Sequence, residues 1–257
     1  MTERPQPRRT AHRPALSAIA LLGLGLAILS ALAEALSGLG HRWGWWHYGT
    51  GFLILRWAAT GGLIAAGLSM LGGFFGLLQR TGSRVVAAFL GVAVGFAVTG
   101  VPLSQMRMAQ RVPPIHDITT DTEDPPKFRA ILPLRKGAPN TAKYGGPAIA
   151  ALQKKGYPDL APARYALPPE EVFVRALAAA RGMGWRIVAA TLSEGRIEAV
   201  DRTFWFGFYD DVVIRIRREG SGARVDVRSL SRVGRSDVGA NARRIKTFLK
   251  KLAEEMR

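Results

Sequence analysis

The chain contains no cysteine among its 257 residues and only four histidines. The absence of cysteine excludes disulfide bonds, cysteine-ligated zinc, iron–sulfur clusters and thiol catalysis. His116 is the only histidine beyond the N-terminal apolar region. The sequence also lacks the HExxH, Walker, dinucleotide-binding and nucleophile-elbow motifs. It therefore indicates neither a metal site nor a cofactor.

Acidic residues are scarce. Lys and Arg number 36 against 19 Asp and Glu, which gives a formal net charge of +17. After residue 103 there are 28 basic and 17 acidic residues, so that part alone carries +11. A field of this sign favours anionic partners such as lipid headgroups, anionic glycans or nucleic acid.

Charge is nearly absent from residues 16–103, where three apolar runs cover residues 16–36, 52–78 and 85–103. At about 1.5 Å per helical residue, each run is long enough to span a hydrocarbon core of about 30 Å. No row of polar residues crosses these runs, which disfavours a channel or a transporter. Small residues recur every four positions and indicate helix–helix contact faces: Gly61, Ala65, Ser69, Gly73 in one run and Ala87, Gly91, Gly95, Thr99 in another. We expect a three-helix transmembrane anchor over residues 16–103.

Arginine placement predicts the orientation of this anchor. Residues 1–15 form a basic tail, and the short loop between the second and third runs contains Arg80 and Arg84. Because basic loops stay in the cytoplasm, both segments are predicted to be cytoplasmic, which places residues 104–257 on the far side. In a Gram-negative cell this is a multi-pass inner-membrane (cytoplasmic-membrane) protein with a periplasmic C-terminal domain. Whether the first run is a cleaved signal peptide stays open, but cleavage leaves the same external C-terminus.

Residues 104–166 are predicted to be a proline-rich linker packed on the following domain. Residues 102–169 hold 12 of the chain's 15 prolines, which disfavours regular helices and central strands. The linker contains the acidic motif "PPIHDITTDTEDPPKF" and a short helix near residues 147–155. We expect it to cross the wet face of a sheet or to pair with an edge strand.

Residues 167–257 are predicted to be an α+β domain. A helix begins at "PPEEVF", four segments then alternate apolar and polar residues, and a final amphipathic helix ends the chain. Its apolar stripe is expected to hold Val238, Ala242, Ile245, Leu249, Leu252 and Met256, and its outer side Arg243, Arg244, Lys246, Lys250 and Lys251. Short glycine turns imply a four-stranded antiparallel sheet, whose apolar face is covered by the two helices. Asp210 and Asp211 are expected in a turn before the third strand. The other, wetter face is expected to carry Arg215, Arg217, Arg224, Asp226 and Arg228.

The candidate site is the stretch "RSLSRVGRSDVGANARRI", residues 228–245, which leads into the last helix. Ser236 or Asp237 is a suitable N-cap, and Arg228, Arg232 and Arg235 precede it. Arginines beside a helix N-terminus form a plausible cradle for an anionic ligand. Two other interpretations remain open: the arginines form a solvated surface, or they pair with the acidic linker residues Asp117, Asp121, Glu123 and Asp124.

Three separated blocks resemble the domain-of-unknown-function family 1499: "IHDITTDTEDPPKF", "EGRIEAVDRTFWFGFYDDVVIRIR" and "RVDVRSLSRVGRSDVGANARRIKTFL". The resemblance covers roughly residues 113–252, and it brings no established activity. It marks a set of motif positions in this sequence: Asp117, Thr120, Asp121, Arg228, Ser229, Arg232, Gly234, Ser236, Asp237 and Asn241.

The leading hypothesis is a non-enzymatic inner-membrane protein. Its extracytoplasmic basic domain binds an anionic envelope component or a protein partner, and membrane lipids are further partners. Nucleic acid is not expected, because the domain is predicted to lie outside the cytosol. The alternative is an envelope hydrolase that uses His116 with Asp117, which are neighbours in the sequence.

Overall fold

The computed structural model describes residues 13–257, and the chain divides into two compact units with a boundary between Gln105 and Met106. Most of the predicted basic tail lies outside the described residues. The two units are described separately below.

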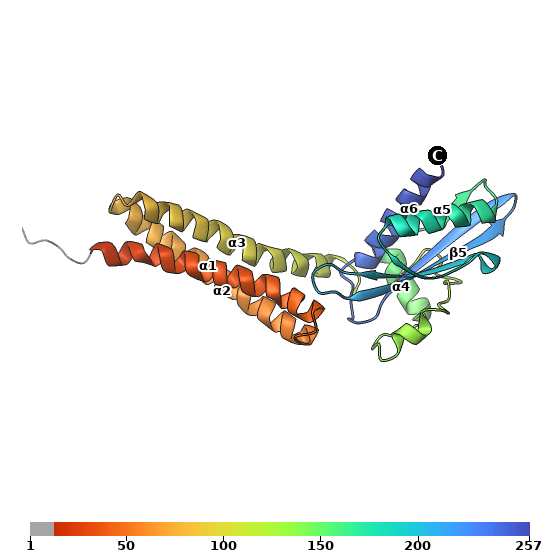
Figure 1. Cartoon of the computed structure of the whole chain (residues 1–257), viewed down its shortest axis with the longest axis horizontal. Helices are drawn as coiled ribbons and strands as arrows, with labels where there is room; N and C mark the ends of the chain where they lie inside the picture. The colour runs from red at the N-terminus through yellow and green to blue at the C-terminus, as the bar shows by residue number, and fades with distance from the viewer. Residues whose placement is uncertain (1–12) are drawn as a thin grey trace, which may run out of the picture. The chain divides into compact units, whose positions relative to one another are not determined.

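Three long helices make up the N-terminal region: α1 (Arg13–Arg42), α2 (Tyr48–Leu78) and α3 (Gly82–Arg111) (Figure 1). All three are long and apolar enough to cross a membrane. Large apolar side chains point outward from them, including Leu22, which is 68% exposed, and Phe89, which is 73% exposed. An apolar exterior of this kind indicates association with a membrane.

The helices approach one another through small residues. A Cβ atom added to Gly72 would lie 2.1 Å from the backbone nitrogen of Ala20, and one added to Gly95 would lie 2.5 Å from the carbonyl oxygen of Gly62. Larger side chains cannot occupy such contacts without moving the backbones apart. The predicted contact positions Gly91 and Ser69 are buried, and they face each other closely enough that a Cβ on Gly91 would meet the Ser69 hydroxyl.

The second unit contains an antiparallel sheet of six strands in the order β1-β6-β5-β4-β3, and β2 also pairs with β6. The four predicted strands are present as β3 (Arg186–Thr191), β4 (Arg196–Arg202), β5 (Tyr209–Glu219) and β6 (Gly222–Ser231). The prediction of four strands is wrong because two edge strands come from the proline-rich segment: β1 (Asp117–Thr119) and β2 (Ala163–Tyr165). Three residues are too few to show an alternating pattern, so only pairing with β6 makes these segments strands.

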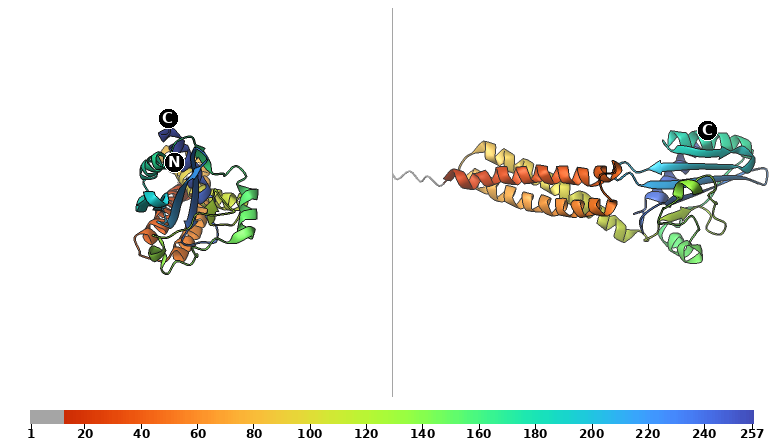
Figure 2. Two further views of the ribbon diagram at one scale, coloured as in Figure 1. Left: turned by 90° about the vertical axis from the view of Figure 1, so that its right-hand side faces the viewer. Right: turned by 60° about the horizontal axis from the view of Figure 1, so that its bottom comes forward.

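Helices α5 (Pro169–Gly182) and α6 (Ala240–Glu255) cover one face of the sheet, as predicted (Figures 1 and 2). The core between them is apolar, and the rings of Trp185 and Phe248 stack with their centroids 5.4 Å apart. On α6 the predicted stripe is buried at Ala242, Ile245 and Leu252. Arg244, which was expected on the outer side of this helix, is instead only 8% exposed.

The proline-rich segment covers the opposite face. It contains a 3-10 turn, η1 (Leu132–Arg135), and α4 (Gly146–Gly156), close to the predicted short helix. Phe128 and Ile131 from this segment are buried against Val200, Val213 and Leu230 of the sheet. The prediction of a wet face is therefore wrong at its centre, where Asp226 is 0% exposed and Arg228 is 2% exposed.

Asp210 and Asp211 lie within β5 rather than in a turn before it, because β4 ends at Arg202 and residues 203–208 form the turn. Successive strand residues point to opposite faces. Asp210 accordingly faces the helices, whereas Asp211 faces the proline-rich segment. The two carboxylates are both buried, and they belong to different polar clusters.

Candidate functional site

Arg228, the first arginine of the predicted site, is bound entirely within the protein. Its Nε and Nη2 atoms donate to the two carboxylate oxygens of Asp117, each at 2.8 Å. The guanidinium also donates to the carbonyl oxygens of Pro126 and Ala142. Above it lie the rings of Phe128 and Tyr144, 5.0 and 5.5 Å from the guanidinium carbon. Burial raises the pKa of Tyr144 to about 12, which fits a closed cover over this arginine.

Arg232 binds a carboxylate of the sheet rather than of the acidic motif. Its Nη2 donates to Oδ1 of Asp211 at 2.7 Å, and its Nη1 donates to the Leu134 carbonyl oxygen at 2.9 Å. Arg135 from η1 contacts the same carboxylate from the other side and donates to the Asn140 carbonyl oxygen at 2.7 Å. A buried aspartate thus holds two guanidinium groups, one from the loop and one from the proline-rich segment.

Asp121 joins a cluster of three arginines on the sheet. Arg224 donates to it at 2.7 Å, Arg215 at 3.2 Å and Arg217 at 3.3 Å. Its other oxygen accepts the backbone N–H groups of Glu123 and Asp124 at 3.1 and 3.0 Å. Burial alone raises the pKa of Asp121, but these backbone bonds and the guanidinium charges outweigh it, so the pKa lies below its usual value. Of the acidic residues considered as partners of the arginine loop (Arg228, Arg232 and Arg235), Asp117 pairs with Arg228. Asp121 does not pair with this loop but with the strand cluster of Arg215, Arg217 and Arg224.

Thr120 continues the edge pairing that β1 begins. Its N–H donates to the Val227 carbonyl oxygen at 2.9 Å, and its hydroxyl accepts the Val227 N–H at 2.8 Å. On the outer side of β1, the side-chain amide of Gln153 from α4 makes the two hydrogen bonds that the backbone of a further strand would make. It accepts the Thr119 N–H at 3.0 Å and donates to the Thr119 carbonyl oxygen at 2.6 Å. The edge of the sheet is therefore covered, which prevents further strand pairing there.

A second buried network lies between the sheet and α6. The Asn241 side chain accepts a hydrogen bond from Ser229 at 2.7 Å and donates to Ser231 and to the His116 carbonyl oxygen, each at 2.9 Å. Arg244 donates to Asp210 at 2.5 Å and to Ser229 at 3.1 Å, and it also contacts Asn241. Ser229 and Asn241 thus hold the loop against the sheet from the side opposite to Arg228.

The N-cap of α6 is Gly239 rather than the predicted Ser236 or Asp237, but Asp237 still binds amide groups at the start of the helix. Its Oδ1 accepts the Gly239 N–H and its Oδ2 accepts the Asn241 N–H, each at 2.8 Å. Ser236 accepts the Val238 N–H at 3.2 Å. Burial is the largest influence on the pKa of Asp237 and raises it, although the backbone bonds act in the opposite direction. The carboxylate of Asp237 thus binds the amide groups that were expected to bind an anionic ligand. Arg235, the third arginine of the predicted site, is exposed.

His116 and Asp117 do not form a catalytic pair in this geometry. The Asp117 carboxylate is held on both oxygens by Arg228. The Nδ1 atom of His116 lies 3.3 Å from the Arg235 carbonyl oxygen. Among the described residues, no group of three or more histidine or acidic side chains is arranged to hold a metal ion.

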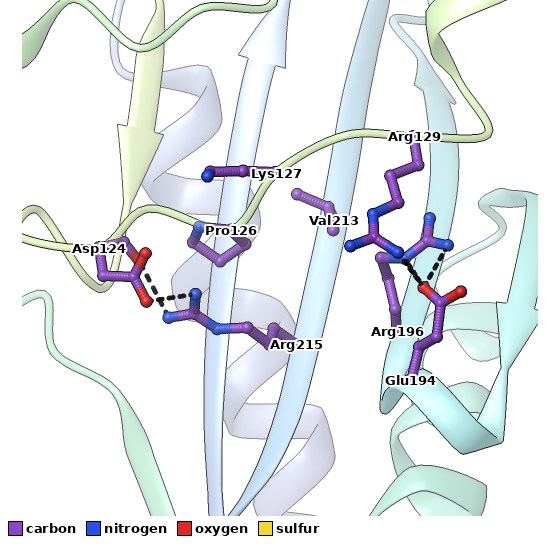
Figure 3. A pocket seen from close by; sticks show the side chains of 8 residues that line it. All are labelled: Asp124, Pro126, Lys127, Arg129, Glu194, Arg196, Val213 and Arg215. Atoms are coloured by element: carbon purple, nitrogen blue, oxygen red, sulfur yellow. Dashed lines mark hydrogen bonds and ion pairs between the residues drawn. The ribbon is translucent and has the colours of Figure 1, made fainter.

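An open pocket of about 410 Å³ lies where the proline-rich segment crosses β4 and β5. Figure 3 shows Val213 between two ion-paired groups, Asp124 with Arg215 on one side and Glu194 with two arginines on the other. The two arginines are Arg129 and Arg196, which donate to Glu194 at 2.9 and 2.6 Å. The remaining lining residues are Pro126 and Lys127. They belong to the part of the proline-rich segment that crosses the sheet, called the crossing segment below.

The pocket has more cationic than acidic side chains, four against two. Arg129 is 65% exposed and Asp124 is 59% exposed, so these pairs lie at the solvent surface. A hydrogen bond from Arg196, together with the charge of Arg129, lowers the pKa of Glu194 and keeps this carboxylate ionised. Exposed ion pairs of this kind are screened by water, so they add little to the stability of the fold.

One family model matches the part of the chain that contains the sheet and its two helices. Residues 117–252 match the model described as "Protein of unknown function (DUF1499)". The match covers 136 of 257 residues, just over half of the chain. The chain belongs to the DUF1499 family. No curated protein matches it.

The DUF1499 match begins at Asp117 and so includes the crossing segment as well as the sheet. The side chains at the motif positions noted in the sequence lie in four separate places: Asp117 with Arg228, Asp121 with the strand arginines, Arg232 with Asp211, and Ser229 with Asn241 and Asp237 behind the sheet. No pattern in the sequence indicates the pocket. Lys127 and Arg129 follow a proline pair, and no periodic signal marks them as neighbours of β4.

Proposed function

We propose that this DUF1499 protein is a non-enzymatic binding protein of the cytoplasmic membrane, anchored by three transmembrane spans. Its C-terminal domain lies outside the cytosol and binds an anionic envelope component in the pocket beneath the crossing segment. The exposed cationic side chains of Lys127 and Arg129 at that pocket carry the proposal. A volume of about 410 Å³ falls within the range of small-molecule sites, about 300–1,000 Å³.

The pocket is a better anion site than the arginine loop because its cations are accessible. Arg228 and Arg232 are buried or partly buried, and their charges are neutralised by Asp117 and Asp211. At the pocket, by contrast, Lys127 is exposed and Arg129 is 65% exposed. A phosphate or carboxylate group can reach both side chains without unfolding the cover.

The membrane-bound setting supports an envelope ligand. The three apolar helices precede the domain, and the basic loop between α2 and α3 favours a cytoplasmic position for that loop. In this proposal, three spans put the C-terminal domain on the side of the membrane opposite to the N-terminal tail. Anionic lipids and glycans are the abundant anions in that compartment, and both present phosphate or carboxylate groups.

The test is a titration of the full chain in nanodiscs of zwitterionic lipid with inorganic phosphate and with a glucuronate oligosaccharide. Isothermal calorimetry is expected to show saturable binding of at least one probe. The double variant Lys127→Gln/Arg129→Gln should weaken that binding at least about tenfold, since it removes two charge-assisted hydrogen bonds.

The matched control is Arg181→Gln/Lys250→Gln, which removes the same charge from exposed positions on α5 and α6. It should leave the affinity unchanged. Equal weakening in both double variants would show a general charge effect and would contradict a pocket. The alternative is that the pocket binds a protein partner. This alternative would be favoured if neither probe bound and a photo-crosslinker at position 127 captured a protein in intact membranes.

A further inference from the structure

Lys127 differs from the other cationic side chains that line the pocket. Its amino group is exposed and makes no hydrogen bond or ion pair within residues 13–257 (Figure 3). Arg129, Arg196 and Arg215, the other three lining cations, each contact at least one carboxylate. The uncompensated positive charge of the pocket is therefore concentrated on a single side chain.

On one side of Val213, two arginines and two glutamates balance each other. Arg129 and Arg196 both donate to Glu194, at 2.9 and 2.6 Å. Arg196 also contacts the carboxylate of Glu198, which is 0% exposed and accepts the backbone N–H of Arg129 at 2.9 Å. Two positive and two negative charges thus neutralise each other within this group.

The strand cluster, on the other side of Val213, is balanced in the same way. Its three arginines share three carboxylates, those of Asp121, Asp124 and Asp226. Glu219 lies 3.9 Å from Arg224, but its closer partner is Arg164 at 2.6 Å. Three positive charges therefore meet three negative charges on this side.

The charge balance limits the charge of a ligand. Together with Lys127, the two groups hold six cationic and five acidic side chains, a net charge of +1. The cost of removing an ion from water rises with the square of its charge, whereas its attraction to one cation rises only in proportion. Asp124 and Glu194 also repel a dianion about twice as strongly as a monoanion. The pocket therefore favours a singly charged group.

We propose that the pocket selects an oxyanion group with one negative charge, as in a phosphodiester or a carboxylate, over a doubly charged phosphomonoester. Lys127 forms the ion pair with this group and so determines the preference. The inference rests on the proposed function of the pocket and specifies its class of ligand. Arg129 donates to Glu194 through Nη1, which leaves its Nε and Nη2 groups to bind a second oxygen of the ligand.

Three small probes test the preference by calorimetry on the full chain in a maltoside detergent, which contains no phosphate or carboxylate group. Dimethyl phosphate and methyl glucuronide carry one negative charge at both pH 5 and pH 8. Methyl phosphate changes from a monoanion to a dianion near about pH 6. The two singly charged probes report any titration of the protein itself, and they distinguish a phosphodiester ligand from a carboxylate.

At least one singly charged probe is expected to bind saturably, with an affinity that changes less than about twofold between the two pH values. Methyl phosphate should bind at least about fivefold more weakly at pH 8 than at pH 5. Equal or tighter binding of methyl phosphate at pH 8 would overturn the preference and leave the proposed function standing. Failure of all three probes to bind would instead contradict the proposed function, and the preference with it.

The role of Lys127 is tested by Lys127→Gln, which should weaken binding of the singly charged probe at least about tenfold. Lys127→Arg should retain it. The matched control is Lys136→Gln, an exposed position in the proline-rich segment that does not line the pocket. Equal weakening by Lys127→Gln and Lys136→Gln would overturn the assignment of Lys127.

The charge balance itself is tested by Asp124→Asn, which raises the net charge around the pocket to about +2. Asp124 is 59% exposed, so the substitution is tolerated by the fold. The variant should bind methyl phosphate at pH 8 at least about threefold more tightly than the parent protein. Asp159→Asn makes the same change at an exposed position paired with Lys246 and should have no effect. Identical affinities in the two variants would contradict the proposal.

Discussion

Arg228 and Asp117 lie on neighbouring strands and share two hydrogen bonds of 2.8 Å, with side chains only 3% and 7% exposed. The pair joins β6 to a strand that comes from the proline-rich segment. A buried ion pair does not by itself add much stability, but removing one partner leaves an uncompensated charge. The pair therefore makes the crossing segment an integral part of the domain.

We expect Arg228→Met to lower the free energy of unfolding by about 3–5 kcal/mol, because Asp117 would remain buried without its partner. Asp117→Asn should have an effect of similar size, and the double variant should cost clearly less than the sum. Chemical denaturation of the full chain in detergent, followed by near-ultraviolet circular dichroism, measures these values. Additive effects would mean that the two side chains act independently.

The strand cluster and the arginine loop are expected to act independently. Asp121 contacts Arg215, Arg217 and Arg224, whereas Arg232 contacts Asp211. Asp121→Ala and Arg232→Ala should therefore add within about 0.5 kcal/mol. A large coupling energy between them would show that the loop and the acidic motif interact more directly than their contacts indicate.

Acid stability should depend on Asp121. Its folded-state pKa lies below the ordinary 3.8, so its contribution is present above that pH and is lost as the pH falls through the folded-state pKa. Asp121→Asn is therefore expected to be less stable than the parent protein at neutral pH and to lose less stability below about pH 3.8. Thermal unfolding across that range tests the sign. Parallel curves for the two proteins would contradict the assignment.

Behind the sheet, Asn241 satisfies polar groups on Ser229, Ser231 and the His116 backbone. Asn241→Ala leaves several of them buried without a partner, each at a cost of about 1–3 kcal/mol, so a destabilisation of at least about 2 kcal/mol is expected. Thr247→Ala, on the exposed side of the same helix, is the control and should change stability by less than about 0.5 kcal/mol. Denaturation curves for both variants provide the comparison.

Orientation is tested by fusing reporters after Arg257. Alkaline phosphatase, which needs an oxidising compartment, should be active there, and a fluorescent protein that folds only in the cytosol should be dark. Fusions after Arg80, between α2 and α3, should give the opposite result. A fluorescent C-terminal fusion would place the domain in the cytosol and would remove the basis for an envelope ligand.

Much of the scaffold was predictable because its signals are local. The four longer strands alternate apolar and polar residues, and α5 and α6 each carry an apolar stripe. The edge strands β1 and β2 were not predictable, since three residues near prolines carry no period. Arg244 was misplaced for a related reason. Helical spacing put it on the charged side of α6, but Asp210 and Asp201 make a buried position favourable for it.

The apolar helices, the cationic cysteine-free C-terminal part and the helix–sheet–helix order can all be derived from the amino-acid pattern, because each depends on residues a few positions apart. Which carboxylate neutralises each arginine depends on the folded chain. Asp117 and Arg228 are 111 positions apart, and Asp121 and Arg224 are 103 apart. Such pairs form only after the crossing segment lies on the sheet, which depends on burial of Phe128 and Ile131 rather than on any local pattern.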